Sequence, residues 1–169
     1  MKRLITAGML ALALLAAGCD KLSSKPAAFQ NTDLTGLDYA KGFSLTDHTG
    51  KARTLADFKG KLVVLFFGYT QCPDVCPTTM AEMAAVLKEL GPAASEVQVL
   101  FVTLDPERDT QELLASYVPA FDKRFLGLRG TPEQTAATAK EFKVFVAKVP
   151  GKEPGSYTVD HTAGGYVFD

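Results

Sequence analysis

Residues 62–77 read LVVLFFGYTQCPDVCP, and they contain the clearest indication of the fold in the sequence. The first seven residues form an unbroken apolar run rich in β-branched and aromatic side chains, which is typical of a strand buried on both faces of a parallel sheet. Pro77 suits the first turn of a helix, and apolar residues recur at helical spacing from 78 to 90. The stretch therefore predicts a central strand, a cysteine-containing loop and a helix.

Outward from this stretch, strands and helices are expected to alternate. The expected elements are a hairpin at 43–55, strands at 97–104, 126–128, 157–159 and 165–168, and helices at 110–118 and 131–142. This order predicts an α/β protein of thioredoxin-like fold, in which a central mostly parallel sheet is flanked by helices and preceded by an N-terminal β-hairpin. His48 lies in the turn of that hairpin, where we expect it to be solvated.

The N-terminus is typical of a bacterial lipoprotein. A short basic start is followed by an apolar run over 4–17, and small residues precede Cys19. The run is shorter than the roughly 20 residues that span a bilayer. We therefore expect a signal peptide at 1–18, a lipidated tether at 19–36 and one folded domain at 37–169. The lipid on Cys19 would hold the protein at the periplasmic face of the inner membrane, and an uncleaved anchor would give the same compartment.

The charge balance excludes one class of partner. The 18 Lys and Arg residues nearly match the 19 Asp and Glu residues, for a formal net charge of -1. A protein without a basic excess has no bulk field that attracts a polyanion. We expect no binding to nucleic acid.

Cys72 and Cys76 are the only cysteines besides Cys19. They follow the carboxyl end of the central strand, where open α/β sheets form a ligand crevice, and the helix N-terminus favours a thiolate. Because thiolates both bind metals and attack disulfides, both uses remain open. The three residues between the cysteines, rather than two, favour a shared metal site. A structural disulfide would close a very small loop and leave His161 without a role.

His161 is the expected third metal ligand. It lies 85 residues after Cys76 in a small-residue segment before a late strand, and such a segment in a thioredoxin-like sheet returns to the cysteine end. Two thiolates and an imidazole suit Cu(I), or Cu(II) with one further ligand, whereas structural zinc would require a fourth protein ligand. Asp105 could orient a ligand or shift a thiol pKa, or could cap its own loop. Asp74 and Asp160 are not expected to bind the metal.

Three segments together resemble the Sco (SenC) family: GYTQCPDVCP at 68–77, VTLDPERDT at 102–110 and YTVDHT at 157–162. The resemblance extends over residues 43–168. It implies a thioredoxin-like fold, and copper bound in both oxidation states by Cys72, Cys76 and His161. It also implies copper delivery to the CuA centre of cytochrome c oxidase subunit II, and it matches Asp105 to an aspartate that couples copper to the cysteines.

Two functions remain open after this resemblance. A monomeric copper metallochaperone would exchange copper with subunit II and with other copper chaperones, and it would need no bond-making catalysis. The alternative is a periplasmic thiol-disulfide oxidoreductase that uses Cys72 and Cys76 as its redox pair to maintain the cysteines of those partners. A peroxide-reducing enzyme of the same fold is a third possibility.

The C-terminus departs from the family pattern. Family members usually continue past the third segment with another strand and a C-terminal helix, whereas this sequence stops at Asp169. We therefore expect a domain that is incomplete at its C-terminus, with one edge or face of its sheet uncovered.

Overall fold

The computed structural model describes residues 31–169, so the expected signal peptide, Cys19 and the first part of the tether lie outside the described residues. The chain divides into two units, Met1–Leu37 and Asp38–Asp169. Residues 31–37 include a turn in which the Leu37 N–H donates to the Leu34 carbonyl over 3.1 Å. Every described strand and helix belongs to the second unit. Between residues 31 and 169, no helix has both the length and the apolar character needed to cross a membrane.

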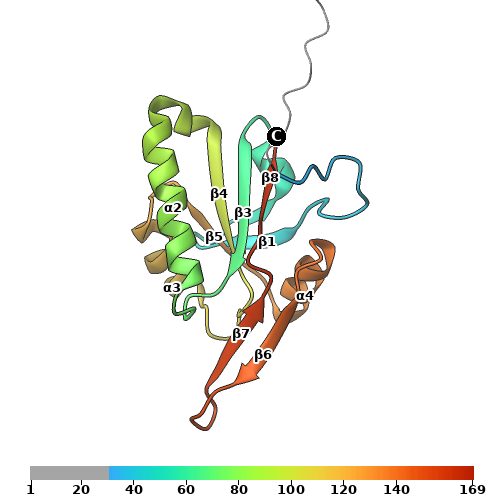
Figure 1. The fold of residues 1–169 in the computed structure, drawn as a ribbon, viewed down its shortest axis with the longest axis vertical. Helices are drawn as coiled ribbons and strands as arrows, with labels where there is room; N and C mark the ends of the chain where they lie inside the picture. Colours follow the sequence, from blue (N-terminus) through green and yellow to red (C-terminus); the bar gives the residue numbers. More distant parts are fainter. Residues whose placement is uncertain (1–30) are drawn as a thin grey trace, which may run out of the picture. The chain divides into compact units, whose positions relative to one another are not determined.

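A six-stranded sheet forms the centre of the second unit (Figure 1), in the order β2-β1-β5-β4-β3-β8. Its strands are β1 (Ser44–Asp47), β2 (Ala52–Thr54), β3 (Leu62–Gly68), β4 (Val97–Thr103), β5 (Leu126–Arg129) and β8 (Gly165–Phe168). β4 pairs in parallel with both β3 and β5, whereas β1, β2 and β8 make antiparallel pairs. The sheet is therefore mixed, and its parallel part is confined to the three central strands. The predicted N-terminal hairpin is present as β1 and β2.

Helices cover both faces of this sheet. They are α2 (Val75–Leu90), α3 (Gln111–Tyr117) and α4 (Pro132–Glu141), with 3-10 segments η1 (Leu55–Phe58), η2 (Gly91–Glu96) and η3 (Val118–Ala120). The hydroxyls of Thr110 and Thr131 cap α3 and α4 by accepting backbone N–H groups of their first turns. α2 begins three residues before the predicted start, because the Asp74 carbonyl already accepts the Thr78 N–H over 3.2 Å. Cys76 thus lies inside the first helical turn.

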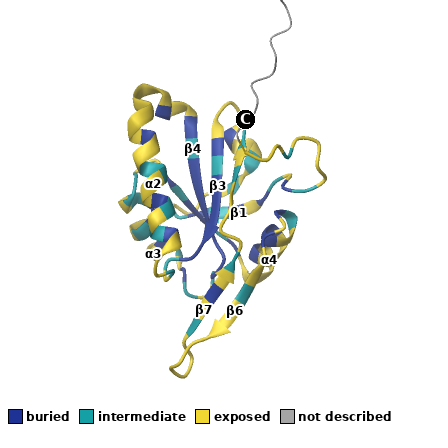
Figure 2. Cartoon of the chain, viewed as in Figure 1, coloured by how far each residue is buried: buried dark blue, intermediate teal, exposed yellow. Residues whose placement is uncertain are grey.

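The alternation of side chains along β3 creates two cores, one on each face of the sheet. Leu65 and Phe67 point into the α4-side core, which also contains Ala139 and Phe142. Phe66 points the other way, into the α2-side core. That core also contains Cys76, Met80 and Leu87 of α2, Leu114 of α3 and Phe101 of β4. Full burial of each large apolar side chain contributes about 1.5–3 kcal/mol, which explains the continuous apolar run in β3. Figure 2 shows β3 and β4 as largely buried.

The six-stranded sheet and its helices form what we call the body, and a separate two-stranded antiparallel sheet projects from it. This second sheet consists of β6 (Val146–Pro150) and β7 (Tyr157–His161), and we call it the β6–β7 ribbon. The sequence did not predict β6, whose side chains are mostly exposed. β7 is two residues longer than expected, so that His161 is its last residue and does not lie in the loop that follows.

Candidate metal centre

The cysteine pair lies where β3 runs into α2. The Cys72 N–H donates to the Tyr69 carbonyl over 3.2 Å, which closes a turn directly after the strand. One helical turn later, the Cys76 N–H donates to the Cys72 sulfur over 3.4 Å. Cys72 is half-buried, Cys76 is buried, and both are free thiols. The spacing of four positions therefore directs a backbone N–H of the first helical turn at the Cys72 sulfur.

Gly68 provides the space for the Cys76 sulfur. A Cβ atom at this position would lie 2.8 Å from Cys76 Sγ and 2.9 Å from a ring carbon of Phe101. Such distances are shorter than any ordinary contact, so a larger residue would displace the sulfur or the ring. The sequence contained no local signal for this role, since the contact joins the end of a strand to the following helix and to a neighbouring strand.

A buried carboxylate fixes the loop before the cysteines. Asp109 accepts the Thr70 N–H (3.1 Å), the Thr70 hydroxyl (2.6 Å) and the Thr103 hydroxyl (2.6 Å). Burial raises the pKa of Asp109, although the hydrogen bonds from the two threonines oppose the shift. The 102–110 motif contained this residue, but the sequence did not indicate that it ties the end of β4 to the cysteine loop.

His161 reaches the cysteines from the ribbon. Alternation along β7 puts Tyr157, Val159 and His161 on one face, and Val159 is buried in the α4-side core. His161 Nε2 lies 3.9 Å from the Cys76 sulfur, and its ring meets Tyr69 edge-on with centroids 6.1 Å apart. Nδ1 lies 2.9 Å from the Thr162 carbonyl oxygen, which can only accept. In the tautomer that carries its proton on Nδ1, this nitrogen donates to that carbonyl and the lone pair of Nε2 faces the sulfur.

The distance from Cys76 to His161 fits a shared metal ion. With a metal–sulfur bond of about 2.3 Å and a metal–nitrogen bond of about 2.0 Å, one ion would hold these donors roughly 3.5 to 4 Å apart. With the side chains in their present positions, residues 31–169 contain no group of three or more His, Cys, Asp or Glu residues that could hold one metal ion. A third bond, from Cys72, therefore requires the three donor side chains to move closer together.

The two thiols have different electrostatic environments. Burial acts to raise the pKa of Cys72, but hydrogen bonds from Cys76 and from backbone N–H groups at the start of α2 outweigh it, so the pKa lies below its usual value. Burial raises the pKa of Cys76 to about 12, and the neighbouring Cys72 adds to that shift. Cys72 is therefore the more readily ionised thiol.

The whole described chain matches one protein family. A sequence model of the SCO1/SenC family matches residues 31–169. The chain belongs to this family. The resemblance drawn from the three sequence segments is thereby confirmed.

Relatives of known structure share the fold of this Sco protein. The Bradyrhizobium japonicum ScoI structure, which has copper bound, is 45% identical with a TM-score of 0.72, and the match covers 76% of this chain and 81% of ScoI. The apo Sco1 structure from Thermus thermophilus is 43% identical with a TM-score of 0.72, covering 83% of this chain and 81% of the other. These matches confirm the predicted thioredoxin-like α/β fold.

The sequence comparison gives a mitochondrial relative. The SCO2 homolog of Bos taurus is 43% identical over 128 residues, which are 75% of this chain and 48% of the bovine protein. The chain thus spans about half the length of the curated relatives it matches.

Asp105 in this Sco chain contacts both the β6–β7 ribbon and its own loop. Its buried carboxylate accepts the Tyr157 hydroxyl over 2.8 Å and forms an ion pair with Arg108. Its contacts are therefore with the strand that carries His161. Its backbone carbonyl accepts the N–H groups of Arg108 and Asp109, so the residue also closes its own loop.

The remaining polar candidates are His48, Asp74 and Asp160. His48 is half-buried, and its Nδ1 accepts the Gly127 N–H of β5 over 3.0 Å. The expectation of a solvated histidine was wrong, because the hairpin turn folds back on the neighbouring strand. Asp74 and Asp160 are exposed.

Proposed function

We propose that this Sco protein is a copper metallochaperone that holds copper through Cys72, Cys76 and His161. The 3.9 Å separation of Cys76 Sγ from His161 Nε2, across 85 residues of sequence, carries the proposal. The donor set supports it as well, since two thiolates and an imidazole suit Cu(I) and can hold Cu(II) with a further ligand. The 45% identical ScoI, with copper bound, supports the choice of metal.

The proposed destination of the copper is the CuA centre of cytochrome c oxidase subunit II, with other copper chaperones as further partners. Cys72 is half-exposed at the surface of the site, whereas Cys76 is buried. An incoming thiolate can therefore replace Cys72 first and leave copper on the remaining two donors until the exchange is complete. The protein would act as a monomer, anchored by lipid on Cys19 at the periplasmic face of the inner membrane, with Asp105 supporting the site.

A second candidate function is thiol-disulfide exchange with the same partners. It is favoured by the arrangement of an outer sulfur that accepts a backbone N–H and an inner sulfur behind it. Cys72 would attack a partner disulfide, and Cys76 would resolve the mixed disulfide, releasing the partner as a dithiol and leaving Cys72–Cys76 oxidised. This function does not require His161.

A histidine substitution separates the two functions. We expect the reduced full chain in detergent to bind one copper, and His161→Ala to weaken Cu(I) binding at least about tenfold in a competition titration. Disulfide exchange with a model disulfide should stay near the wild-type rate. His48→Asn, which keeps an acceptor toward Gly127, is the matched control and should bind copper normally.

The opposite result would redirect the proposal. If the wild-type chain takes up no stoichiometric copper while its disulfide exchange remains fast, the oxidoreductase function replaces the metallochaperone.

A further inference from the structure

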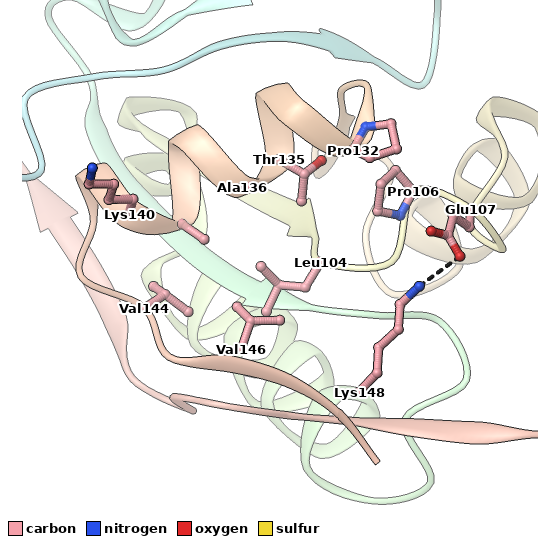
Figure 3. Close-up of a pocket in the computed structure, with 11 residues that line it drawn as sticks. Leu104, Pro106, Glu107, Pro132, Thr135, Ala136, Lys140, Val144, Val146 and Lys148 are labelled. Carbon is pink, nitrogen blue, oxygen red and sulfur yellow. Dashed lines mark hydrogen bonds and ion pairs between the residues drawn. The ribbon is translucent and has the colours of Figure 1, made fainter. Parts of the chain in front are cut away.

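The β6–β7 ribbon carries His161 but has little backbone attachment to the body. Among the described strands, β6 and β7 pair only with each other and not with the central sheet. A groove of about 540 Å³ separates part of β6 from α4 (Figure 3), with Leu104 and Val146 among its apolar lining. The ribbon therefore does not pack closely on α4 along this length, and side chains on the β7 face must hold it in place.

Arg108 makes the densest set of these side-chain contacts. Its guanidinium carbon lies 3.7 Å from the centroid of the Tyr157 ring, and its Nη1 donates to the Tyr157 carbonyl over 2.9 Å. Nε forms the ion pair with Asp105, which also accepts the Tyr157 hydroxyl over 2.8 Å. Tyr157 is thus held through its backbone, its ring face and its hydroxyl at once.

The same cation reaches the cysteine loop. Arg108 Nη1 also donates to Gln71 Oε1 over 3.0 Å, and Gln71 directly precedes Cys72. The guanidinium carbon lies 5.8 Å from the ring centroid of Tyr69, which contacts His161. Arg108 therefore bridges the loop that carries the outer sulfur and the strand that carries the histidine.

A second cation supports the ribbon more weakly. Lys148 of β6 pairs with Glu107 over 2.7 Å at one end of the groove (Figure 3), and its Nζ lies 4.8 Å from the Tyr157 ring centroid. Both side chains of the pair are about half exposed, and exposed ion pairs contribute little because water and salt screen them. Of the two cations, Arg108 therefore makes the stronger attachment.

We propose that Arg108 is a positioning residue for the copper site: by clamping Tyr157, it holds the ribbon so that His161 lies against Cys76. This inference rests on the proposed copper function. Because Tyr157 and His161 share one face of β7, a pivot of the ribbon at Tyr157 moves the imidazole with it. Arg108 contacts no thiol and acts through His161.

The chain contains a matched control for this role. Arg53 pairs with Asp47 with side-chain exposures of 19% and 0%, against 21% and 1% for Arg108 and Asp105. Arg53 also lies over an aromatic ring, 5.7 Å from the centroid of Phe58. The two pairs have similar burial and chemistry, but the Arg53 pair belongs to the N-terminal hairpin and not to the ribbon.

Hydrogen exchange of the metal-free full chain tests the clamp without copper. In Arg108→Met, the amides of Tyr157–His161 should exchange about tenfold faster than in the wild type, while the slow amides of β3 and β4 are little changed. Arg53→Met should leave the β7 amides at the wild-type rate. Equal acceleration of β7 in both variants, or none in Arg108→Met, would overturn the proposal.

A double-substitution cycle tests whether Arg108 acts through His161. Arg108→Met should lower Cu(I) affinity about tenfold in the otherwise wild-type chain, and should have no further effect in the His161→Ala background. An equal drop in both backgrounds would mean that Arg108 acts by its charge or on the cysteines, and the positioning role would be wrong. If the wild-type chain binds no copper, the proposed function fails, whereas the exchange measurement still decides whether the clamp exists.

Discussion

The cysteine half and the histidine half of the site are built by different means. Cys76 is fully buried in the α2-side core, one helical turn from Cys72, and β3 is paired with β4 as far as its last residue, Gly68, and with β8 as far as Phe66. His161 comes from a ribbon whose adjacent residue Phe145 is 63% exposed and whose attachment to the body is made by side chains. The sulfurs have a fixed frame, whereas the imidazole depends on a few long-range contacts.

This difference implies different free energies of opening. A segment with few buried apolar contacts opens locally at a free energy well below that of global unfolding. In the ribbon, Val159 alone is buried in the core, whereas β3 and β4 are buried over most of their lengths (Figure 2). We therefore expect substitutions in the cysteine half to lower global stability and substitutions in the ribbon to change local opening. A ligand on a segment that opens locally would suit the proposed transfer of copper.

The largest expected effect is that of Gly68→Ala in the cysteine half. The added methyl group would lie 2.8 Å from the Cys76 sulfur, so the sulfur or Phe101 must move. Overpacking of this kind costs about 1–3 kcal/mol, and we expect the free energy of unfolding in urea to fall by this amount. Copper affinity should fall as well, because the displaced sulfur is a proposed donor.

Gly165→Ala in β8 provides the control for Gly68→Ala. A Cβ there lies 3.5 Å from its nearest neighbour, the Leu65 carbonyl oxygen, which is an ordinary contact. Its effect on stability should be small. If Gly68→Ala lowers the free energy of unfolding no more than Gly165→Ala does, the cysteine half can accommodate the added methyl group. The inferred contrast between the two halves would then be wrong.

Low pH should lower the stability of the body, because Asp47 at the hairpin turn becomes protonated. Burial opposes ionisation, but hydrogen bonds from Thr49 and Arg53 outweigh it and lower the pKa of Asp47 from 3.8 to about 2. A carboxyl whose pKa is depressed on folding stabilises the protein above its unfolded pKa and loses this contribution as the pH falls. We expect a loss of about 2 kcal/mol between about pH 4 and pH 2.

Two variants test the acid effect by urea titration at several pH values. Asp47→Asn should lower stability at pH 7 by about the same amount and remove this part of the acid dependence. Asp38→Asn should change little, because Asp38 is 91% exposed and pairs only with Lys41. Neither substitution should alter hydrogen exchange in β7. A ribbon that opened faster in Asp47→Asn would show that it is coupled to the whole fold.

The cysteine half was largely predictable because its structure is local. The unbroken apolar run in β3 requires burial on both faces, and the helical pattern after Cys76 requires a helix on one of them. Only the predicted start of α2 was wrong, by three residues, because the backbone of Asp74 already closes a helical turn. Here the pattern of each segment and its tertiary surroundings agree.

The histidine half was not predictable to the same depth. β6 contains Lys148 and Pro150, faces solvent, and is a strand because β7 pairs with it. The contact of Arg108 with Tyr157 joins positions 49 residues apart, and no local pattern indicates it. The motifs contained both residues, and the sequence predicted His161 as a ligand, but the physical reason for its position lies in contacts that only the folded chain displays.

The smallest expected effect, and the most specific one, is that of Tyr157→Phe. This change removes the hydroxyl that donates to Asp105 and keeps the ring on which Arg108 stacks. Loss of one hydrogen bond to the Asp105 carboxylate should make the β7 amides exchange about three- to tenfold faster, with little change in global stability. Thr158→Ala, on the outward face of β7, should leave exchange unchanged. If Tyr157→Phe instead lowers global stability without accelerating hydrogen exchange in β7, the ribbon unfolds only together with the body. The inferred contrast between a histidine on a locally opening ribbon and cysteines in a fixed core would then be wrong.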